Sequence, residues 1–273
     1  MPLTLVPIDD PSDPRLDPYR AVRERDLVGR AGLFVAEGEV VLRMLAASRR
    51  FAAVSALIVD KRRDKLADLL AALDPDVPVY LVPQAVIDTV AGFEIHRGIL
   101  ALGRRPEPVP ADALLAGLPA RALVVAAVGI ANHDNMGGIF RNAAAFGAAA
   151  VLLDPTSCDP LYRKAIRVSV GGVLAMPFAR LAAEDDLPDL LARHGFTAFA
   201  LSPQGSTRLA DLARPPRAAV ILGAEGPGLP AALLARTHTV RIPMAAGFDS
   251  LNVATTSGIV LHRLAEADGL PVS

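Results

Sequence analysis

Short apolar runs alternate with stretches of helical periodicity along most of the chain. Runs of about four to eight apolar residues are typical of strands, and a 3.6-residue apolar period is typical of helices. In the first third of the chain, this pattern predicts strands at 33–35, 54–59, 77–82 and 99–102, and helices at 40–47, 65–73 and 86–90. The first third is therefore expected to form a compact α/β unit.

Two stretches of this front unit carry mostly polar residues. Residues 11–18 are rich in proline and aspartate and predict a loop, and residues 19–30 predict a charged helix with Arg20, Arg23, Arg25 and Arg30. A second basic group, Lys61 to Arg63 with Lys65, follows an expected strand. Each basic group fits either a solvated surface or a surface that contacts the phosphates of RNA, and the pattern leaves both interpretations open.

The segment from Arg104 to Pro110 contains three prolines in its last five residues. Proline fixes the backbone and lacks an N–H group, so such a segment is stiff and pairs poorly with other strands. We therefore expect a front domain at 1–105, a linker at 106–120 and a second domain at 121–273.

The second domain repeats the alternation. The expected strands are 122–128, 150–153, 198–201, 219–222 and 240–244. One expected helix begins at Asp134 or Asn135 and ends at Gly147. Two more span 161–171 and 187–193, and Ser250 caps a last helix. Because helices connect successive strands, the sheet should be mostly parallel.

Two of these strands, 219–222 and 240–244, are followed by glycines and polar residues that a strand does not require. Gly223 to Gly228 follows the first, and Gly247 with Ser250, Leu251 and Asn252 follows the second. Ligands of open α/β sheets bind at such strand ends, where glycine lets the backbone approach a ligand closely. Glycine turns and a helix cap would explain each feature alone, but their occurrence together indicates a binding site. A nucleotide held by the glycine turn is an alternative interpretation.

Composition excludes several other classes of site and partner. The single cysteine, Cys158, cannot form an internal disulfide, and the five histidines are scattered, so we expect no metal site. No apolar run approaches the ~18 residues of a membrane span, and the N-terminus does not resemble a signal peptide. These features favour a cytoplasmic protein without a membrane partner. The net charge of −1 gives no global attraction to nucleic acid, although a local basic face would suffice to bind RNA.

Three ordered motifs of the second domain resemble the SpoU (TrmH-like) family of RNA 2′-O-ribose methyltransferases, within the SPOUT superfamily. The motifs are Asn135-x-Gly137-x-x-x-Arg141, then Leu222 to Leu229, then Ile242-Pro243-Met244 with Ser250 to Ala254. More loosely, Phe34 to Gly38 and His96 to Ile99 are similar to the L30e/L7Ae-like RNA-binding domain. The first motif departs from the family at His133, where a proline is common.

This resemblance implies an α/β fold with a mostly parallel sheet and a C-terminal trefoil knot, preceded by a smaller L30e-like α/β domain. It implies an enzyme that uses S-adenosylmethionine to methylate the 2′-hydroxyl of a ribose in rRNA or tRNA, and that works as a homodimer. The residues implied to contact the cofactor are Leu222, Gly223, Gly228, Ile242, Met244 and Leu251. Those implied to act in catalysis are Asn135, Arg141, Glu225, Ser250 and Asn252.

The family's catalytic position matches Arg141, which is often described as the base. An arginine stays protonated in proteins and cannot accept a proton. Our hypothesis is that Arg141 holds a phosphate and stabilises the developing alkoxide, while the phosphate or water takes the proton. A surface arginine on an amphipathic helix, or a non-catalytic RNA-binding protein that keeps the fold, are the alternatives. The sequence does not identify the RNA or the nucleotide.

Overall fold

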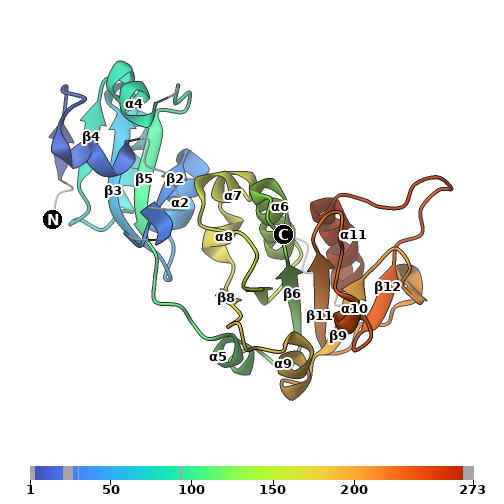
Figure 1. The fold of residues 1–273 in the computed structure, drawn as a ribbon. Helices are drawn as coiled ribbons and strands as arrows, with labels where there is room; N and C mark the ends of the chain where they lie inside the picture. The colour runs from blue at the N-terminus through green and yellow to red at the C-terminus, as the bar shows by residue number, and fades with distance from the viewer. Residues whose placement is uncertain (1–3, 21–26, 30, 93, 267–273) are drawn as a thin grey trace. The chain divides into compact units, whose positions relative to one another are not determined.

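The structure is a computed structural model that describes residues 4–20, 27–29, 31–92 and 94–266 (Figure 1). The chain divides into two compact units. Unit 1 comprises Met1–Glu107 and Leu161–Ala175, and unit 2 comprises Pro108–Pro160 and Met176–Ser273. Within the described residues, none of the helices combines the length and the apolar character that crossing a membrane requires.

Unit 1 is built on a five-stranded sheet in the order β1-β4-β3-β5-β2. Its strands are β1 (Leu5–Pro7), β2 (Leu33–Glu37), β3 (Ala52–Val59), β4 (Val79–Val82) and β5 (Ile99–Arg104). Strand β5 runs antiparallel to both β3 and β2, whereas β1, β4 and β3 are parallel. The sheet is therefore mixed, and every strand that the alternation predicts for the first third of the chain is present.

Short helices surround this sheet. They are η1 (Pro14–Tyr19), α2 (Glu39–Ala46), η2 (Asp60–Arg62), η3 (Asp64–Leu66), α3 (Ala67–Ala71), α4 (Gln84–Ala91), α7 (Arg163–Val168) and α8 (Gly172–Ala175). Leu16, Leu57, Ile87 and Leu100 meet in one apolar cluster of the core. Tyr19 joins them, and its hydroxyl lies 2.6 Å from Ser55 Oγ, so this buried polar group has a partner.

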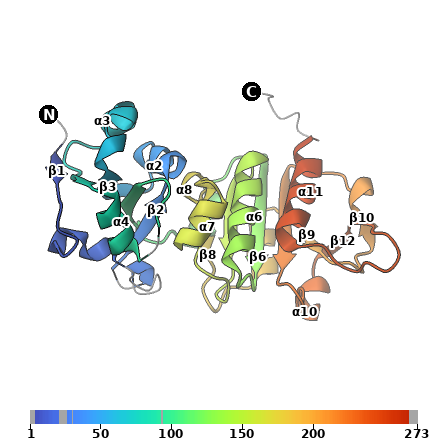
Figure 2. The same ribbon diagram turned by 90° about the horizontal axis from the view of Figure 1, so that it is seen from above.

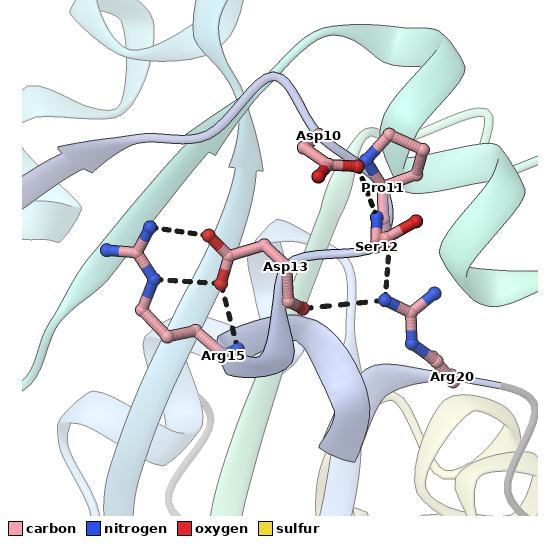
Figure 3. Close-up of polar contacts among 6 residues, drawn as sticks. All are labelled: Asp10, Pro11, Ser12, Asp13, Arg15 and Arg20. Carbon is pink, nitrogen blue, oxygen red and sulfur yellow. Dashed lines mark hydrogen bonds and ion pairs between the residues drawn. The ribbon is translucent and has the colours of Figure 1, made fainter.

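Residues 11–18, predicted as a loop, contain part of a short 3-10 helix. Asp13 caps η1 by accepting from the Arg15 N–H at 2.9 Å, and the Arg15 side chain pairs with the same carboxylate (Figure 3). Arg20 donates to the carbonyl oxygens of Pro11 and Asp13 (Figure 3). The loop prediction failed because Pro14 has the fixed φ that suits a first helical position and Asp13 is a good cap. Most of the charged helix expected at 19–30, with Arg23, Arg25 and Arg30, lies outside the described residues.

Of the helix expected at 161–171, residues 163–168 form α7, and a second short helix, α8, follows it at 172–175; both belong to unit 1. Between them, Val170 and Gly171 have φ values of +53° and +81°. A positive φ ends a right-handed helix, and a β-branched residue rarely adopts it. Helix α7 therefore ends at Val168, three residues before the predicted end.

Unit 2 is built on a seven-stranded sheet in the order β10-β12-β9-β11-β6-β7-β8. Its strands are β6 (Ala122–Val128), β7 (Ala150–Leu153), β8 (Phe178–Arg180), β9 (Thr197–Leu201), β10 (Thr207–Arg208), β11 (Arg217–Gly223) and β12 (His238–Arg241). Each neighbouring pair is parallel, as the sequence predicts. Strand β12 is shorter than expected at its carboxyl end, because Pro243 has no N–H to pair.

Helices of unit 2 bury alternate residues of the sheet. These helices are α5 (Ala111–Ala116), α6 (His133–Ala145), α9 (Leu187–Arg193), η4 (Leu209–Asp211), α10 (Ala231–Leu234) and α11 (Val253–Glu266). Val124, Leu152 and Ile221 join an apolar cluster with Leu115 of α5 and Leu190 of α9. Helix α5 lies inside the stretch that we expected to be a linker, and Leu115 is fully buried.

Helices α6 and α11 lie side by side (Figures 1 and 2). A Cβ at Gly138 would lie only 2.5 Å from the Ala254 Cβ, so the two helices approach as closely as a bare backbone allows. Asn142 Nδ2 then donates to the Ala254 carbonyl oxygen at 2.7 Å and to Ser257 Oγ at 2.8 Å. This contact fixes α11, at the end of the chain, against α6.

A second set of contacts fixes the loop that leads from β6 into α6. Asp154, at the end of β7, accepts hydrogen bonds from the Gly129 N–H at 2.9 Å and from Ser157 Oγ and Thr156 Oγ1 at 2.5 Å. Ser157 Oγ in turn accepts from the Ile130 N–H at 3.0 Å. The strand ends of β6 and β7 are thus joined, which sets the start of α6.

We expect the contact between α6 and α11 to be limited by space at Gly138. Gly138→Ala should lower stability, because an overpacking cost of about 1–3 kcal/mol exceeds the roughly 1 kcal/mol that alanine gains as a helix former. Adding Ala254→Gly should recover most of the loss, measured by urea unfolding of all four combinations. If the effects of the two substitutions on the free energy of unfolding were additive, this close contact would be contradicted.

The Asp154 contacts predict a defined pH dependence. Partial burial by itself would raise the pKa of Asp154, but hydrogen bonds from Ser157, Thr156 and the Gly129 N–H outweigh it and lower the pKa. A lowered pKa stabilises the fold above the pKa of the unfolded chain, about 4, and that stability is lost as the pH falls through the folded value.

Asp154→Asn should therefore unfold more easily than the wild type at neutral pH, and the difference should shrink on acidification below about pH 4. Urea midpoints measured from pH 7 to 3 test this, with Asp211→Asn, at an exposed position, as the control. A difference that stays constant with pH would mean that the Asp154 charge is not involved.

Candidate active site

A cavity of about 730 Å³ lies at the carboxyl ends of three adjacent strands, β12, β9 and β11. Its walls come from residues 201–204 after β9, residues 222–229 at the end of β11, and residues 240–256 around and after β12. The carboxyl edge of a parallel sheet is the usual ligand position of open α/β folds, and the volume suits a small organic ligand. This edge is the one at which the sequence predicts a site.

The glycine turn after β11 forms one wall of this cavity. Gly228 N–H donates to the Ala224 carbonyl oxygen at 3.1 Å, and Gly226 and Gly228 have φ values of +86° and +68°. The turn folds back so tightly that a Cβ at Gly223 would lie 2.8 Å from the Gly228 carbonyl carbon. Glycine at these positions leaves the backbone bare toward the cavity.

The connection from β12 to α11 forms another part of the wall. It is the long loop that leads from β12 back to α11 (Figure 1). Ile242, Met244 and Leu251 line the cavity from this loop, while Phe248 is 76% exposed. The loop therefore presents apolar side chains both to the cavity and to the outside.

Asn252 connects three segments that lie far apart in the sequence. Its Nδ2 donates to Asn135 Oδ1 of α6 at 2.8 Å and to Glu225 Oε1 of the glycine turn at 2.7 Å. Its Oδ1 accepts from the N–H groups of Ala254 and Thr255, at 2.9 and 3.1 Å. Asn135 is buried, whereas Glu225 and Asn252 reach the surface beside the cavity.

These contacts correct two predicted helix caps. Helix α11 is capped by Asn252 and begins at Val253, so Ser250 is not the cap and Asn252 is not inside the first turn. Helix α6 is capped by Asn132, whose side chain accepts from the Asp134 N–H at 2.7 Å. Several good cap residues stand together at each site, and only the path of the chain selects one of them.

Arg141 lies on α6, six residues after Asn135, and its side chain is exposed. Among the described residues, no hydrogen bond or ion pair engages its guanidinium. Asn142, the next residue, is held against α11, so the helix that carries Arg141 is fixed in rotation. The arginine is therefore positioned by its helix while its five N–H donors are left for a ligand.

The structure brings most of the predicted site residues together. All six residues implied to contact the cofactor line the cavity: Leu222, Gly223, Gly228, Ile242, Met244 and Leu251. Glu225, Ser250 and Asn252 line it as well. Asn135 is not among the lining residues but is hydrogen-bonded to Asn252, and Arg141 is neither a lining residue nor bonded to this group.

Sequence reasoning missed several polar residues of the cavity wall. Ser202 and Gln204 follow β9, and Asp249 and Thr256 flank the segment around Ser250. The strand before Ser202 was predicted, so its carboxyl end was visible as a candidate. What the pattern does not show is that β9 lies between β11 and β12 in the sheet.

The described part of the chain contains no group of three or more histidine, cysteine or acidic side chains placed to hold a metal ion. Burial, followed by the nearby charge of Asp159, raises the pKa of the Cys158 thiol to about 11. At neutral pH this thiol is protonated and a poor nucleophile.

Comparisons with known proteins place this geometry in a family. The model of the SpoU rRNA Methylase family matches residues 122–262, which contain the cavity walls and α6. A relative from Mycobacterium bovis, described as an uncharacterized tRNA/rRNA methyltransferase, is 40% identical over 265 residues, covering 93% of this chain and 89% of the relative.

Solved structures show the same fold over nearly the whole chain. A structure described as an RNA 2′-O ribose methyltransferase is 27% identical, covers 97% of this chain and 100% of its own, and has a TM-score of 0.78. An AdoMet-bound rRNA methyltransferase from Sinorhizobium meliloti is 24% identical, covers 98% of this chain and 99% of its own, and has a TM-score of 0.79. The family match, the close relative and the fold agree, and the chain belongs to the SpoU rRNA methylase family.

Proposed function

We propose that this protein transfers a methyl group from S-adenosylmethionine to the 2′-hydroxyl of a ribose in rRNA or tRNA. Family membership supports methyl transfer to RNA, and the solved relative described as a 2′-O ribose methyltransferase supports the ribose hydroxyl as acceptor. The observation that supports it most directly is the Asn135–Asn252–Glu225 group, which joins α6 to the rim of a cavity with a glycine-lined wall.

The residues around the cavity fit S-adenosylmethionine. Leu222, Ile242 and Leu251 offer apolar surface for the flat adenine ring, and the bare backbone from Gly223 to Gly228 offers hydrogen-bonding groups. The wall carries two carboxylates, Glu225 and Asp249, whose negative charge matches that of a cationic ligand. When bound, S-adenosylmethionine would supply a methyl group activated by a sulfonium sulfur.

Arg141 is proposed to bind the phosphate beside the reacting ribose. A guanidinium donates two parallel hydrogen bonds to a phosphate, and such charge-assisted pairs also fix geometry. The same positive charge stabilises negative charge that develops on the ribose oxygen as it loses its proton. Arg141 cannot take that proton itself, so we assign the proton to the phosphate or to water.

Asn135, Asn252 and Glu225 are proposed to align the reactants. Their hydrogen bonds connect α6, which carries Arg141, to the loop and turn that enclose the cavity. Methyl transfer requires the attacking oxygen, the methyl carbon and the leaving sulfur to lie in line, and a pre-set alignment contributes several kcal/mol to the rate. Ser250 is proposed to contact the ribose or the cofactor from the same rim.

We also propose that the C-terminal segment forms a trefoil knot and that an L30e-like RNA-binding domain precedes the methyltransferase domain. The path of the chain supports the knot: after β12 it returns past β9 to pack α11 against α6 and β11. Tracing the backbone in a crystal structure will decide whether α11 passes through a loop. The two-unit division and the mixed sheet of unit 1 support a separate front domain.

A homodimer is proposed because large apolar side chains near the site are exposed. Phe248, Leu251 and Ile259 are 76%, 42% and 40% exposed, and they lie on the loop after β12 and on α11. A second copy would remove this surface from water and would lie beside the substrate side of the cavity. As an RNA-modifying enzyme, the protein is expected to act in the cytoplasm.

The activity is tested by incubating the protein with radiolabelled S-adenosylmethionine and total bacterial RNA. We expect label in one RNA size class, and we expect it in dinucleotides that resist alkaline hydrolysis, because alkaline cleavage requires a free 2′-hydroxyl. Label in alkali-sensitive mononucleotides would indicate base methylation and refute the ribose assignment. Calorimetric cofactor binding without label from any RNA would favour the non-catalytic alternative.

Arg141 variants test the proposed phosphate clamp. Arg141→Ala should lower kcat about 100-fold or more while cofactor affinity stays unchanged, as for the loss of a group that stabilises transition-state charge. Arg141→Lys should also lower kcat at least about tenfold, because lysine keeps the charge and loses the forked pair of donors. Arg208→Lys, at another exposed arginine of unit 2, is the matched control. Full activity in Arg141→Lys would rule out the forked contact.

The dimer is tested by placing a charge on the exposed apolar surface. Phe248→Asp combined with Ile259→Asp should convert the protein to a monomer in sedimentation velocity, since an unpaired carboxylate is costly to bury in an interface. Val109→Asp, at a similarly exposed apolar residue with 47% exposure, should leave the sedimentation coefficient unchanged. A wild type that sediments as a monomer would refute the dimer.

A further inference from the structure

The chain makes a tight turn at the cavity wall, just after β9 ends. Gly205 N–H donates to the Ser202 carbonyl oxygen at 2.9 Å, which closes a four-residue turn with Pro203 and Gln204 at its centre. Proline suits the second position of such a turn because its φ is fixed, and glycine is favoured at the fourth. The backbone of Gln204 is therefore held by residues on both sides that favour one conformation.

This turn is fastened to the neighbouring strand β12. Ser202 N–H donates to the Val240 carbonyl oxygen at 3.0 Å. A Cβ at Gly205 would lie 2.4 Å from the Val240 carbonyl carbon, so only glycine lets the turn lie this close to the strand. Arg241 Nη1 donates to the carbonyl oxygens of Gly205 and Ser206, at 2.5 and 2.8 Å. One guanidinium group thus holds the end of the turn.

The side chain of Gln204 is oriented within the same turn. Its Oε1 accepts from Ser202 Oγ at 3.2 Å, and its backbone N–H donates to Ser202 Oγ at 3.4 Å. Both residues line the cavity. Within the part of the chain that the structure describes, no hydrogen bond engages Gln204 Nε2. Its two N–H donors are therefore left for a ligand at the cavity rim.

The sheet order places Gln204 away from the reacting side of the cavity. In the order β12-β9-β11-β6, the end of β9 lies two strands from β6, a separation of roughly 10 Å. Helix α6, which carries Asn135 and Arg141, follows β6, and Asn135 is bonded to Asn252 at the cavity rim. Gln204 therefore lies toward the side of the cavity opposite the proposed position of the transferred methyl group.

The wall around the turn suits the adenosine half of the cofactor better than its charged methionine half. Pro203 and Val240 are apolar, and Gln204 carries no charge. The two carboxylates of the wall, Glu225 and Asp249, lie on the glycine turn and on the loop before α11. Uncharged polar groups among apolar side chains suit a neutral heterocycle, and a glutamine amide has a donor and an acceptor side by side, which matches the edge of adenine.

We propose that Gln204 binds the adenosine half of S-adenosylmethionine and that Arg241 is a positioning residue that holds Gln204 in place. The inference rests on the proposed function, which requires this cofactor. Gln204 Nε2 donates to an acceptor atom of the adenosine half from a turn that Arg241 fastens to β12. Arg241 is not among the lining residues, so it acts on the cofactor through the turn.

Calorimetry with two probes tests the contact. S-Adenosylhomocysteine contains both halves of the cofactor, whereas 5′-methylthioadenosine lacks the amino-acid end. Gln204→Ala should weaken the binding of both probes by the same factor, about tenfold, as for the loss of one or two hydrogen bonds. Weaker binding of S-adenosylhomocysteine alone would place Gln204 at the methionine half, and unchanged binding of both probes would mean that it makes no contact. Either result would overturn the proposal.

Arg241→Ala tests the positioning role. It should weaken both probes about as much as Gln204→Ala does. In the methyl-transfer assay, the KM for S-adenosylmethionine should rise by a similar factor with little change in kcat. Arg208→Ala is the matched control, because Arg208 is exposed and lies opposite Arg241 on β10. This control should bind both probes as the wild type does, and an equal loss there would rule out a specific role for Arg241.

The double variant Gln204→Ala with Arg241→Ala separates positioning from a general structural role. If Arg241 acts through Gln204, the double variant should bind both probes no more weakly than the weaker of the two single variants. Losses that multiply in the double variant would show that Arg241 acts independently of Gln204, and its assigned role would be wrong.

The proposal can fail independently of the proposed function, since probe binding requires no RNA. Methyl transfer to RNA by a protein whose probe affinities do not depend on Gln204 would refute the proposal alone. Equal weakening of both probes in Gln204→Ala, with a wild type that methylates no RNA, would support the adenosine contact and refute the activity.

Discussion

The side chain of Asn252 uses all of its hydrogen-bonding capacity, donating to Asn135 and Glu225 and accepting from the N–H groups of Ala254 and Thr255. The four partners belong to three parts of the site: the start of α6, the glycine turn and the first turn of α11. Loss of this amide would leave the buried Asn135 oxygen without its partner, which is costly. The cap of α11, the cavity rim and the start of α6 therefore depend on the same residue.

The contact between α6 and α11 makes that arrangement possible. Gly138 and Ala254 allow the helices to approach closely, and Asn142 then holds the Ala254 carbonyl oxygen and Ser257. At the other end of α6, Asp154 fixes the entering loop through the Gly129 N–H. Helix α6 is thus held along its length, so Arg141 can stay exposed without losing its orientation.

Unit 2 contains the cavity at the carboxyl edge of its parallel sheet, where strand ends leave backbone groups for a ligand. In unit 1, glycines at positions 38 and 98 leave room for the stems of Arg97 and Arg62.

Much of the fold can be predicted from the sequence because each element has its own local signal. Strands β6 and β7 and helix α9 have the predicted bounds, since unbroken apolar runs and a clear helical period define them. The errors fall where local signals compete. Ser250 and Asn252 are both good caps, Pro243 shortens β12, and the positive φ of Val170 and Gly171 ends α7 before the predicted residue.

The sequence by itself determined which residues are able to form a site: the glycine turn, the apolar residues after β12 and the polar residues at strand ends, because these depend on side-chain chemistry and chain direction. Only the tertiary structure decided which of them meet. The order of β12, β9 and β11 adds Ser202 and Gln204 to the cavity, and the packing of α11 on α6 joins Asn252 to Asn135. Helix α7, which follows β7 in the sequence, packs against β2 in unit 1. Such contacts between distant segments depend on how whole elements pack, and local sequence patterns carry no record of that packing.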